Sequence, residues 1–312
     1  MLEIKRSIGR GFPGTPGGLY DILVQLQNAA FLTPTEVYFV SKGGNNTTGK
    51  SWKTAFTTIE AAITAQTALV AGKPSAEGNV DSYIIVAPGT YPENITTLPF
   101  SCTIIGLGIP GTDKSVLWEN TSGACIAGTV SGLRLINISF GTKGVHDLLD
   151  FNIANNVEIS NCIFWPGDDN VVNAISTENA KFLTIRNCKF ATGSAAGFTA
   201  GIYAFGGANK FFHNCIIENN IIEGLKPTGT GIYIDGNCVN TETIVRNNII
   251  RLTGAGTGIS IGATGSQYKT SIVVGNHVFH VGGTAYDVND LLAAQNIAND
   301  NGTVTMEPNM PT

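Results

Sequence analysis

Val-Glu-Ile-Ser-Asn-Cys-Ile-Phe, residues 157–164, is one of six related phrases that recur along the chain. The copy at 183–190 repeats it closely as Leu-Thr-Ile-Arg-Asn-Cys-Lys-Phe. Repeats of about 20–50 residues are the signature of a solenoid, in which each unit stacks on the next. The aligned asparagines are separated by 24, 26, 32, 28 and 29 residues and are Asn137, Asn161, Asn187, Asn219, Asn247 and Asn276.

Each phrase alternates apolar and polar residues up to its asparagine, which is the period of a β-strand. The positions two before and three after the asparagine are apolar in every copy, so both columns are expected to point into a core. The asparagine between them suits a bend, because Asn tolerates the left-handed backbone conformation. Its amide has donors and acceptors, so we also expect hydrogen bonds from one repeat to the next.

A second column supports this register, and it consists of Gly144-Val145, Ala174-Ile175, Gly201-Ile202, Gly231-Ile232 and Gly258-Ile259. One repeat then holds two or three short strands, and stacking predicts a parallel β-helix, because no repeat can bury its apolar column alone. A leucine-rich repeat lacks support, since the chain has no Leu-x-x-Leu-x-Leu run. A β-sandwich would not explain columns that stay in register.

Composition excludes several classes of protein. Charged residues make up 13% of the 312 residues, about half the usual share of roughly 25%. The net charge of −5 disfavours nucleic-acid binding, and no apolar run approaches the ~18 residues of a membrane span. Residues 1–10 lack the apolar segment of a secretory signal, so classical secretion is not expected. The six cysteines lack metal-site spacing and suit buried, reduced side chains.

Three regions are expected along the chain. Residues 1–35 contain a Gly/Pro-rich run and form an N-terminal arm or anchor, residues 36–281 form the β-helix, and residues 282–312 form a C-terminal cap and tail. A helix is predicted at 57–70, where Thr57 and Glu60 match a capping box. A second short helix is predicted at 287–298, followed by an extended tail.

The first part of the β-helix region carries a family resemblance. A strand at 37–40, a Gly/Asn turn, the helix around Thr58–Ile63, the run 86–91 and the strand 104–106 resemble the start of right-handed β-helices of the pectin-lyase-like superfamily. Phage tailspikes and other phage virion proteins are similar. The resemblance covers about residues 37–281 and implies an all-β, right-handed parallel β-helix with an N-terminal capping helix. It leaves the activity open, because many functions share this scaffold.

Glycan-cleaving members of this superfamily use paired or clustered carboxylates, which must lie about 5–9.5 Å apart for hydrolysis. The candidates here are Asp168, Asp169 and Asp235, although each also fits an ordinary turn. The chain has no Asp-x-Asp-x-Asp calcium run, and His277 and His280 would face opposite sides of one strand. No metal ion or cofactor is therefore expected.

Two outward columns beside the asparagines are informative. Arg186, Glu218 and Arg246 precede three successive asparagines and alternate in sign, which predicts a charge ladder that sets the register. Two positions after the asparagine stand Ile221, Ile249 and Val278, which we expect at a subunit interface. The alternative is that a loop, or the tail after Asp287, covers them.

The resemblance and these features favour a structural protein of a tailed-phage virion, a surface-exposed decoration (cement) or spike protein. It is expected to be a homotrimer, to attach to capsid or tail proteins through residues 1–35, and to assemble in the host bacterial cytoplasm. One alternative is a glycan-cleaving tailspike that uses Asp168, Asp169 and Asp235. Another is a non-enzymatic adhesin that binds host-surface glycan through Tyr203 and Tyr233. Nucleic acid and membrane are not expected partners.

Overall fold

The computed structural model describes most of the chain between Glu36 and Glu307. The described residues are 36–71, 82–120, 122–142, 144–167, 171–191, 197–207, 210–235, 237–262, 271–280, 282–288, 292–294, 296–300 and 303–307. The expected arm at 1–35 lies outside them, and so do Asp168 and Asp169.

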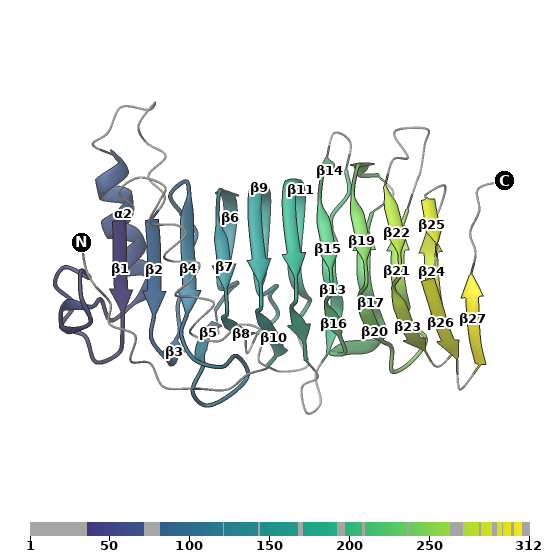
Figure 1. Ribbon diagram of the computed structural model, residues 1–312, viewed down its shortest axis with the longest axis horizontal. Coiled ribbons are helices and arrows are strands. Elements are labelled where there is room, and N and C mark those ends of the chain that lie inside the picture. The colour runs from purple at the N-terminus through teal and green to yellow at the C-terminus, as the bar shows by residue number, and fades with distance from the viewer. Residues whose placement is uncertain are drawn as a thin grey trace, which may run out of the picture. The chain divides into compact units, whose positions relative to one another are not determined.

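Parallel strands stack in register to form a right-handed β-helix of about 7 turns with one N-terminal helix (Figure 1). This confirms the fold class predicted from the repeats. From residue 126 onward, each turn contributes strands to three faces. Two of these faces belong to one 17-stranded sheet, because the long strands β9 and β11 continue from one face onto the other.

The first face holds β6 (Ile126–Ser131), the start of β9 (Leu149–Ser160), the start of β11 (Asn173–Arg186), β13 (Phe198–Ala204), β17 (Leu225–Ile234), β21 (Thr257–Ile261) and β24 (Thr284–Val288). The second face holds β1 (Glu36–Val40), β2 (Ser82–Val86), β4 (Cys102–Gly106), β7 (Arg134–Ile136), the ends of β9 and β11, β15 (Ile216–Glu218), β19 (Ile244–Arg246), β22 (Ile272–Val274) and β25 (Leu292–Ala294). The short strands β14 (Phe211–His213) and β18 (Val239–Thr241) pair between these two faces.

The third face is a separate 10-stranded sheet. It consists of β3 (Gly89–Tyr91), β5 (Val116–Asn120), β8 (Ser139–Thr142), β10 (Ile163–Pro166), β12 (Lys189–Phe190), β16 (Ile221–Ile222), β20 (Ile249–Arg251), β23 (His277–His280), β26 (Asn296–Asp300) and β27 (Thr303–Glu307).

The core is built from the two predicted inward columns. Leu135, Ile159, Ile185, Ile217 and Val245 are fully buried, as are Phe140, Phe164, Phe190, Ile222 and Ile250. Aromatic rings stack from turn to turn, with centroids 5.4 Å apart for Phe140 and Phe164 and 4.8 Å apart for Phe164 and Phe190. Register alone therefore places like side chains on top of one another along the axis.

The asparagine bend joins the second face to the third. Asn137, Asn161, Asn187, Asn219 and Asn247 stand in register, and each has a left-handed backbone with φ between 54° and 62°. At the next turn Gly275 occupies this position, with φ of 65°, so the predicted alignment of Asn276 was wrong by one residue. The buried residues of that turn are consequently Val273 and Val278, and the predicted outward position of Val278 was also wrong.

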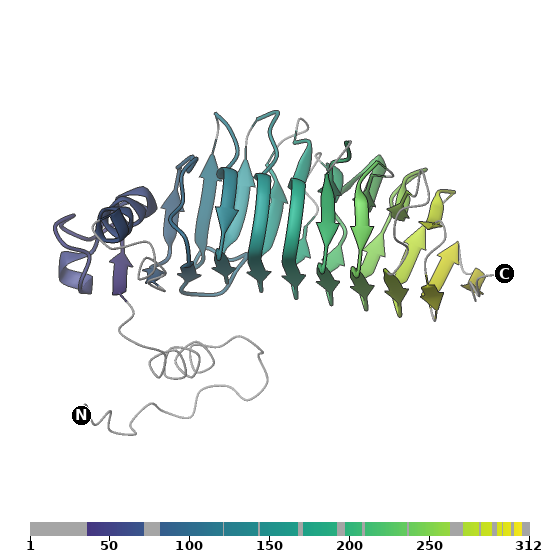
Figure 2. The same ribbon diagram turned by 90° about the horizontal axis from the view of Figure 1, so that it is seen from above.

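Helix α2 (Ile59–Ala71) follows the short 3₁₀ helix Trp52–Thr54 and lies at the β1 end of the stack (Figure 2). It packs on β1 and β2 through Ile59, Ala62 and Ile63. The predicted capping box is not what begins the helix. Thr58 Oγ1 accepts the N–H of Ala61 at 3.2 Å, and the buried Glu93 carboxylate accepts the N–H groups of Ile59 and Glu60 at 3.0 and 2.7 Å.

The C-terminal region differs from the prediction. Residues 287–298 were expected to include a short helix, but the described residues there belong to β24, β25 and β26, which add another turn. Strand β27 then pairs antiparallel with β26. Strand β27 therefore covers the edge of the third face on which a further turn could otherwise stack.

Candidate functional site

The outer side of the first face carries one continuous column of polar and aromatic side chains. Strand pairing aligns Asp150, Ser176, Tyr203, Tyr233, Ser260 and Asp287 on successive turns. The residues just before them on β11, β13, β17 and β21 are fully buried isoleucines. Since successive side chains of a strand point to opposite sides, the column faces outward.

Tyr203 and Tyr233 form the centre of this column. Their rings stack with centroids 5.2 Å apart and planes inclined by only 11°. Phe205, which is 46% exposed, adds a third ring with its centroid 6.0 Å from that of Tyr203. Neighbouring strands lie about 4.8 Å apart, so register itself places the two tyrosines in contact. The result is an aromatic platform that spans two turns.

Acidic side chains surround the platform. Asp235 follows Tyr233 at the end of β17, and its Oδ1 accepts the backbone N–H of Asn237 at 2.9 Å. Partial burial raises the pKa of Tyr203 and of Tyr233, and the negative charge of Asp235 raises both further. Asp147 also contributes to the shift at Tyr203, and Asp287 to that at Tyr233. The tyrosines therefore keep their hydroxyl protons and can donate hydrogen bonds.

A carboxylate cluster lies at one end of the platform. Ser176 donates to Oδ1 of Asp150 at 3.0 Å, and the backbone N–H of Asn173 donates to Oδ1 of Asp147 at 2.8 Å. Burial raises the pKa of Asp147 above its usual value, and nearby Asp150 adds to the increase. Hydrogen bonds from Ser176 and Asn173 oppose the shift. A second carboxylate beside a buried carboxyl group is one requirement of an acid–base pair.

Sequence reasoning found part of this site. Asp235, Tyr203 and Tyr233 were singled out and lie together, whereas Asp168 and Asp169 lie outside the described residues. Asp150 was missed because Gly144-Val145 was aligned with Ala174-Ile175. The true partner of Ile175 is Leu149, and Val145 is 63% exposed. The Leu148-Leu149 pair was the signal that would have placed Asp150 in the tyrosine column.

The other predicted columns lie elsewhere on the surface. Arg186, Glu218 and Arg246 are neighbours on the second face, where Arg246 pairs with Glu218 at 2.6 Å and Arg186 pairs with Glu158 at 2.5 Å. Ile221 is 37% exposed on the third face, and its neighbour Ile249 is half-buried.

The described residues do not provide a metal site, a membrane-spanning helix or a reactive thiol. Among them, no group of three or more His, Cys, Asp and Glu side chains is placed to hold a metal ion. None of the helices found in those same ranges has the length and apolar character to cross a membrane. All six cysteines are buried and free, and burial raises the pKa of Cys102, Cys125, Cys215 and Cys238 to about 12. These thiols are accordingly unreactive core residues.

The fold and the outward column define a β-solenoid protein with an aromatic and acidic surface on its first face. Residues 115–297, more than half of the chain, match the family described as the right handed beta helix region, and the chain belongs to this family. It is a right-handed parallel β-helix. No curated protein sequence matches the chain.

Three solved structures are similar to the chain at low sequence identity. Pectin methylesterase PemA from Erwinia chrysanthemi is 12% identical, with a TM-score of 0.43 over 88% of this chain and 92% of that one. YbhC from Escherichia coli is 13% identical, with a TM-score of 0.41 over 96% and 72%. Pectin methylesterase from carrot is 13% identical, with a TM-score of 0.41 over 87% and 84%.

Proposed function

We propose that this chain is a glycan-binding β-helix protein that stands on the surface of a tailed-phage virion as a spike or decoration protein. The single observation that carries the glycan-binding role is the stacked pair Tyr203 and Tyr233 among acidic side chains. Aromatic rings supply apolar surface together with a polar tip, and a few well-placed polar groups fix the orientation of a ligand.

The charges around the platform favour neutral glycans. Ionised carboxylates accept hydrogen bonds from sugar hydroxyls, and the tyrosine hydroxyls can donate as well as accept. Asp147, Asp150, Asp235 and Asp287 give this face an acidic character, which repels an anionic polysaccharide. An extended neutral chain lying across β13 and β17 would contact both tyrosines.

Binding measurements on tyrosine variants test this role. We expect Tyr203→Ala and Tyr233→Ala each to weaken binding of a neutral host polysaccharide at least tenfold by titration calorimetry, about 1.4 kcal/mol. Phe211→Ala, at another exposed aromatic residue on β14, is the matched control and should bind normally. Unchanged affinity of both tyrosine variants would exclude the first face as the binding surface.

Cleavage of the bound glycan is a second candidate, favoured by the Asp147 and Asp150 cluster. A carboxyl group whose pKa is raised holds its proton to higher pH, as a general acid must. Release of reducing ends that is lost in both Asp147→Asn and Asp150→Asn would establish hydrolysis. Binding without any release would leave the chain as an adhesin.

The virion role rests on the resemblance of residues 37–281 to phage β-helix proteins, and the six buried, free cysteines suit assembly in a reducing cytoplasm. Attachment is assigned to residues 1–35. We expect a truncated protein beginning at Thr35 to fold, with an unchanged circular dichroism spectrum, and to be absent from purified particles. Normal incorporation of the truncated protein would contradict attachment through the arm.

A further inference from the structure

The outward column of the first face reads the same in both directions. From β9 to β24 it runs Asp150, Ser176, Tyr203, Tyr233, Ser260 and Asp287. The contact at one end is repeated at the other. Ser176 Oγ donates to Asp150 Oδ1 at 3.0 Å, and Ser260 Oγ likewise donates to the carboxylate of the next turn at 3.4 Å. The stacked tyrosines are therefore flanked on both sides by a serine and by a carboxylate that the serine orients.

Each tyrosine ring covers only one face of the other. The ring planes are inclined by 11° with centroids 5.2 Å apart, so the second face of each ring is turned toward the serine on its other side. A serine has a single heavy atom beyond Cβ and is too small to cover an aromatic ring. Neighbouring strands lie about 4.8 Å apart, so a group held just outside either serine would lie about that far from a ring on one side and from an aspartate on the other.

A position between an aromatic ring and a carboxylate favours a cation. The face of an aromatic ring attracts an ammonium group that lies within about 6 Å of the ring centroid. A carboxylate accepts a charge-assisted hydrogen bond from the same group. The two serine positions of the column, Ser176 and Ser260, are therefore each suited to one ammonium group.

The carboxylates of this face have no cationic partner in the described ranges of the protein. No Lys, Arg or His side chain in those ranges forms an ion pair with Asp147, Asp150, Asp235 or Asp287. The charge of Asp150 adds to the increase in the pKa of Asp147, so these two acids repel each other. A bound cation would remove this repulsion.

The second face shows the opposite arrangement. Its acids are paired within the protein, since Glu158 lies 2.5 Å from Arg186 and Glu218 lies 2.6 Å from Arg246. The charges of that face neutralise one another along the ladder. The aspartates of the first face differ in this respect, and we expect their counter-charge to come from a ligand.

We propose that the first face binds a glycan whose units carry free amino groups, with one ammonium group held outside Ser176 and another outside Ser260, each between a tyrosine ring and an aspartate. The inference rests on the proposed glycan-binding role of this face and extends the ligand class from neutral chains to cationic ones. The two serines are three strand spacings apart, about 14 Å, so one extended chain along the column would reach both positions. Because the column reads the same in both directions, either orientation of the chain meets the same groups.

Oligomers of glucosamine and of N-acetylglucosamine test this inference, because they share one backbone and differ in the charge of the amino group. Hexamers are used, to match the six turns of the column. Calorimetric titration of the whole protein at low ionic strength should show at least tenfold tighter binding of the glucosamine hexamer, and added salt should reduce the difference. Asp150→Asn and Asp287→Asn should each reduce this preference at least threefold, and the double variant should abolish it. Asparagine keeps an oxygen that accepts the serine hydroxyl, and circular dichroism checks the fold.

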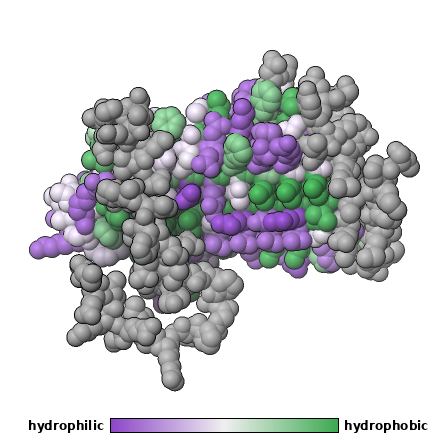
Figure 3. All heavy atoms as spheres, turned by 45° about the horizontal axis from the view of Figure 1, so that its top comes forward, coloured by the Kyte–Doolittle hydropathy of each residue, from purple (hydrophilic) through white to green (hydrophobic). Residues whose placement is uncertain are grey.

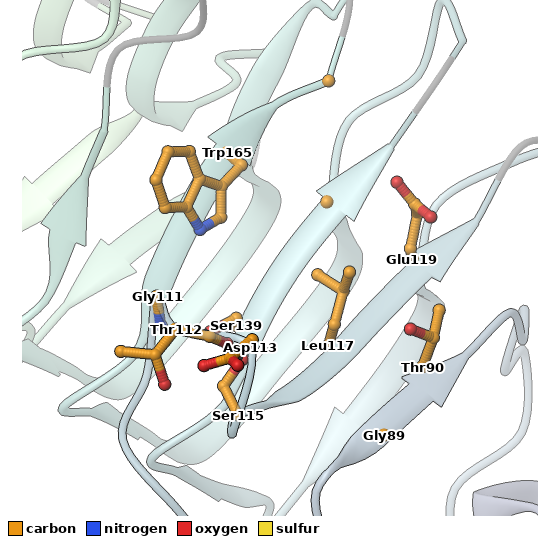
Figure 4. Close-up of a pocket in the computed structure, with 12 residues that line it drawn as sticks. Gly89, Thr90, Gly111, Thr112, Asp113, Ser115, Leu117, Glu119, Ser139 and Trp165 are labelled. Atoms are coloured by element: carbon orange, nitrogen blue, oxygen red, sulfur yellow. Dashed lines mark hydrogen bonds between the residues drawn. The ribbon is translucent and has the colours of Figure 1, made fainter.

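Two controls separate recognition from charge alone. Asp113→Asn removes one exposed carboxylate from the segment between β4 and β5, beside a hollow of the third face (Figure 4). This variant should keep the full preference for the glucosamine hexamer. Spermine carries ammonium groups without sugar rings, and it should bind at least tenfold more weakly than the glucosamine hexamer.

Several results would overturn the amine inference. They are equal affinity for the two hexamers, no binding of the glucosamine hexamer at millimolar concentration, a preference that survives in the double variant or is lost equally in Asp113→Asn, and spermine binding as tight as that of the hexamer. If host polysaccharide still binds in a tyrosine-dependent manner, the glycan-binding role stands while this inference fails. Unchanged binding of host polysaccharide by both Tyr203→Ala and Tyr233→Ala would remove the glycan-binding role itself.

Discussion

At the scale of single residues, a ladder of buried asparagines holds the C-terminal turns together. The backbone N–H and the side-chain amide of Asn248 both donate to Oδ1 of Asn276, and its amide also donates to the carbonyl oxygen of Ile217. Asn220 and Asn276 repeat this pattern on the turns before and after, and Oδ1 of Asn296 accepts the last pair of these bonds. The amides of Asn220, Asn248 and Asn276 each bond to the next turn. Such bonds were expected for the asparagines of the bend but occur at the following position. A buried network that is fully satisfied is stabilising, while a broken one is costly.

Replacement of Asn248 by aspartate should be severe. The added carboxylate oxygen would face the carbonyl oxygen of Ile217 and Oδ1 of Asn276, both of which are acceptors. An uncompensated buried charge costs about 3–5 kcal/mol. Asn247→Asp is the matched control, because this neighbour is exposed and Asp also tolerates the left-handed conformation. It should change the unfolding free energy by less than about 0.5 kcal/mol. Equal urea midpoints for the two variants would show that the ladder contributes nothing.

At the scale of elements, sequence reasoning predicted strands well wherever the phrase was well preserved. The inward columns of the first five copies needed only the alternation of apolar residues, which packing then enforces. The sixth copy failed because Gly275, and not an asparagine, occupies the left-handed position. Glycine adopts this conformation freely. Aligning the sixth copy on its asparagine shifted the register by one residue, which assigned every side chain of that turn to the wrong face of the strand.

Sequence reasoning did not predict the features that depend on contacts between segments distant in the chain. Thr58 caps α2 locally, but Glu93 accepts two further N–H groups of the first turn from 33 and 34 positions away, so local spacing could not reveal its contribution. Burial raises the pKa of Glu93, and the N–H groups of Glu60 and Ile59 oppose that shift. Residues 292–300 have helix-forming composition, but β22 and β23 offer open edges that pair with them as β25 and β26. Such pairing outweighs weak local propensity.

At the scale of the whole solenoid, two outward aliphatic columns in the C-terminal turns are candidates for subunit contact. One is the predicted column of Ile221 and Ile249 on the third face, which Val278 does not extend. The other is Ile216, Ile244 and Ile272 on the second face, all half-buried and in register. The surface view shows a row of hydrophobic side chains between hydrophilic rows (Figure 3).

The last prediction decides between these two columns. We expect a homotrimer that buries Ile221 and Ile249, because closed symmetry is the usual outcome for exposed apolar surface and each buried isoleucine contributes about 1.5–3 kcal/mol. The second-face column is flanked by the paired Glu218 and Arg246, which favours contact with solvent. Ile221→Asp with Ile249→Asp should therefore give folded monomers by light scattering and circular dichroism. Ile216→Asp with Ile244→Asp is the matched control on the neighbouring face and should remain trimeric. A trimeric Ile221/Ile249 variant together with a monomeric Ile216/Ile244 variant would assign the interface to the second face. A monomeric wild-type protein would contradict an interface on either face.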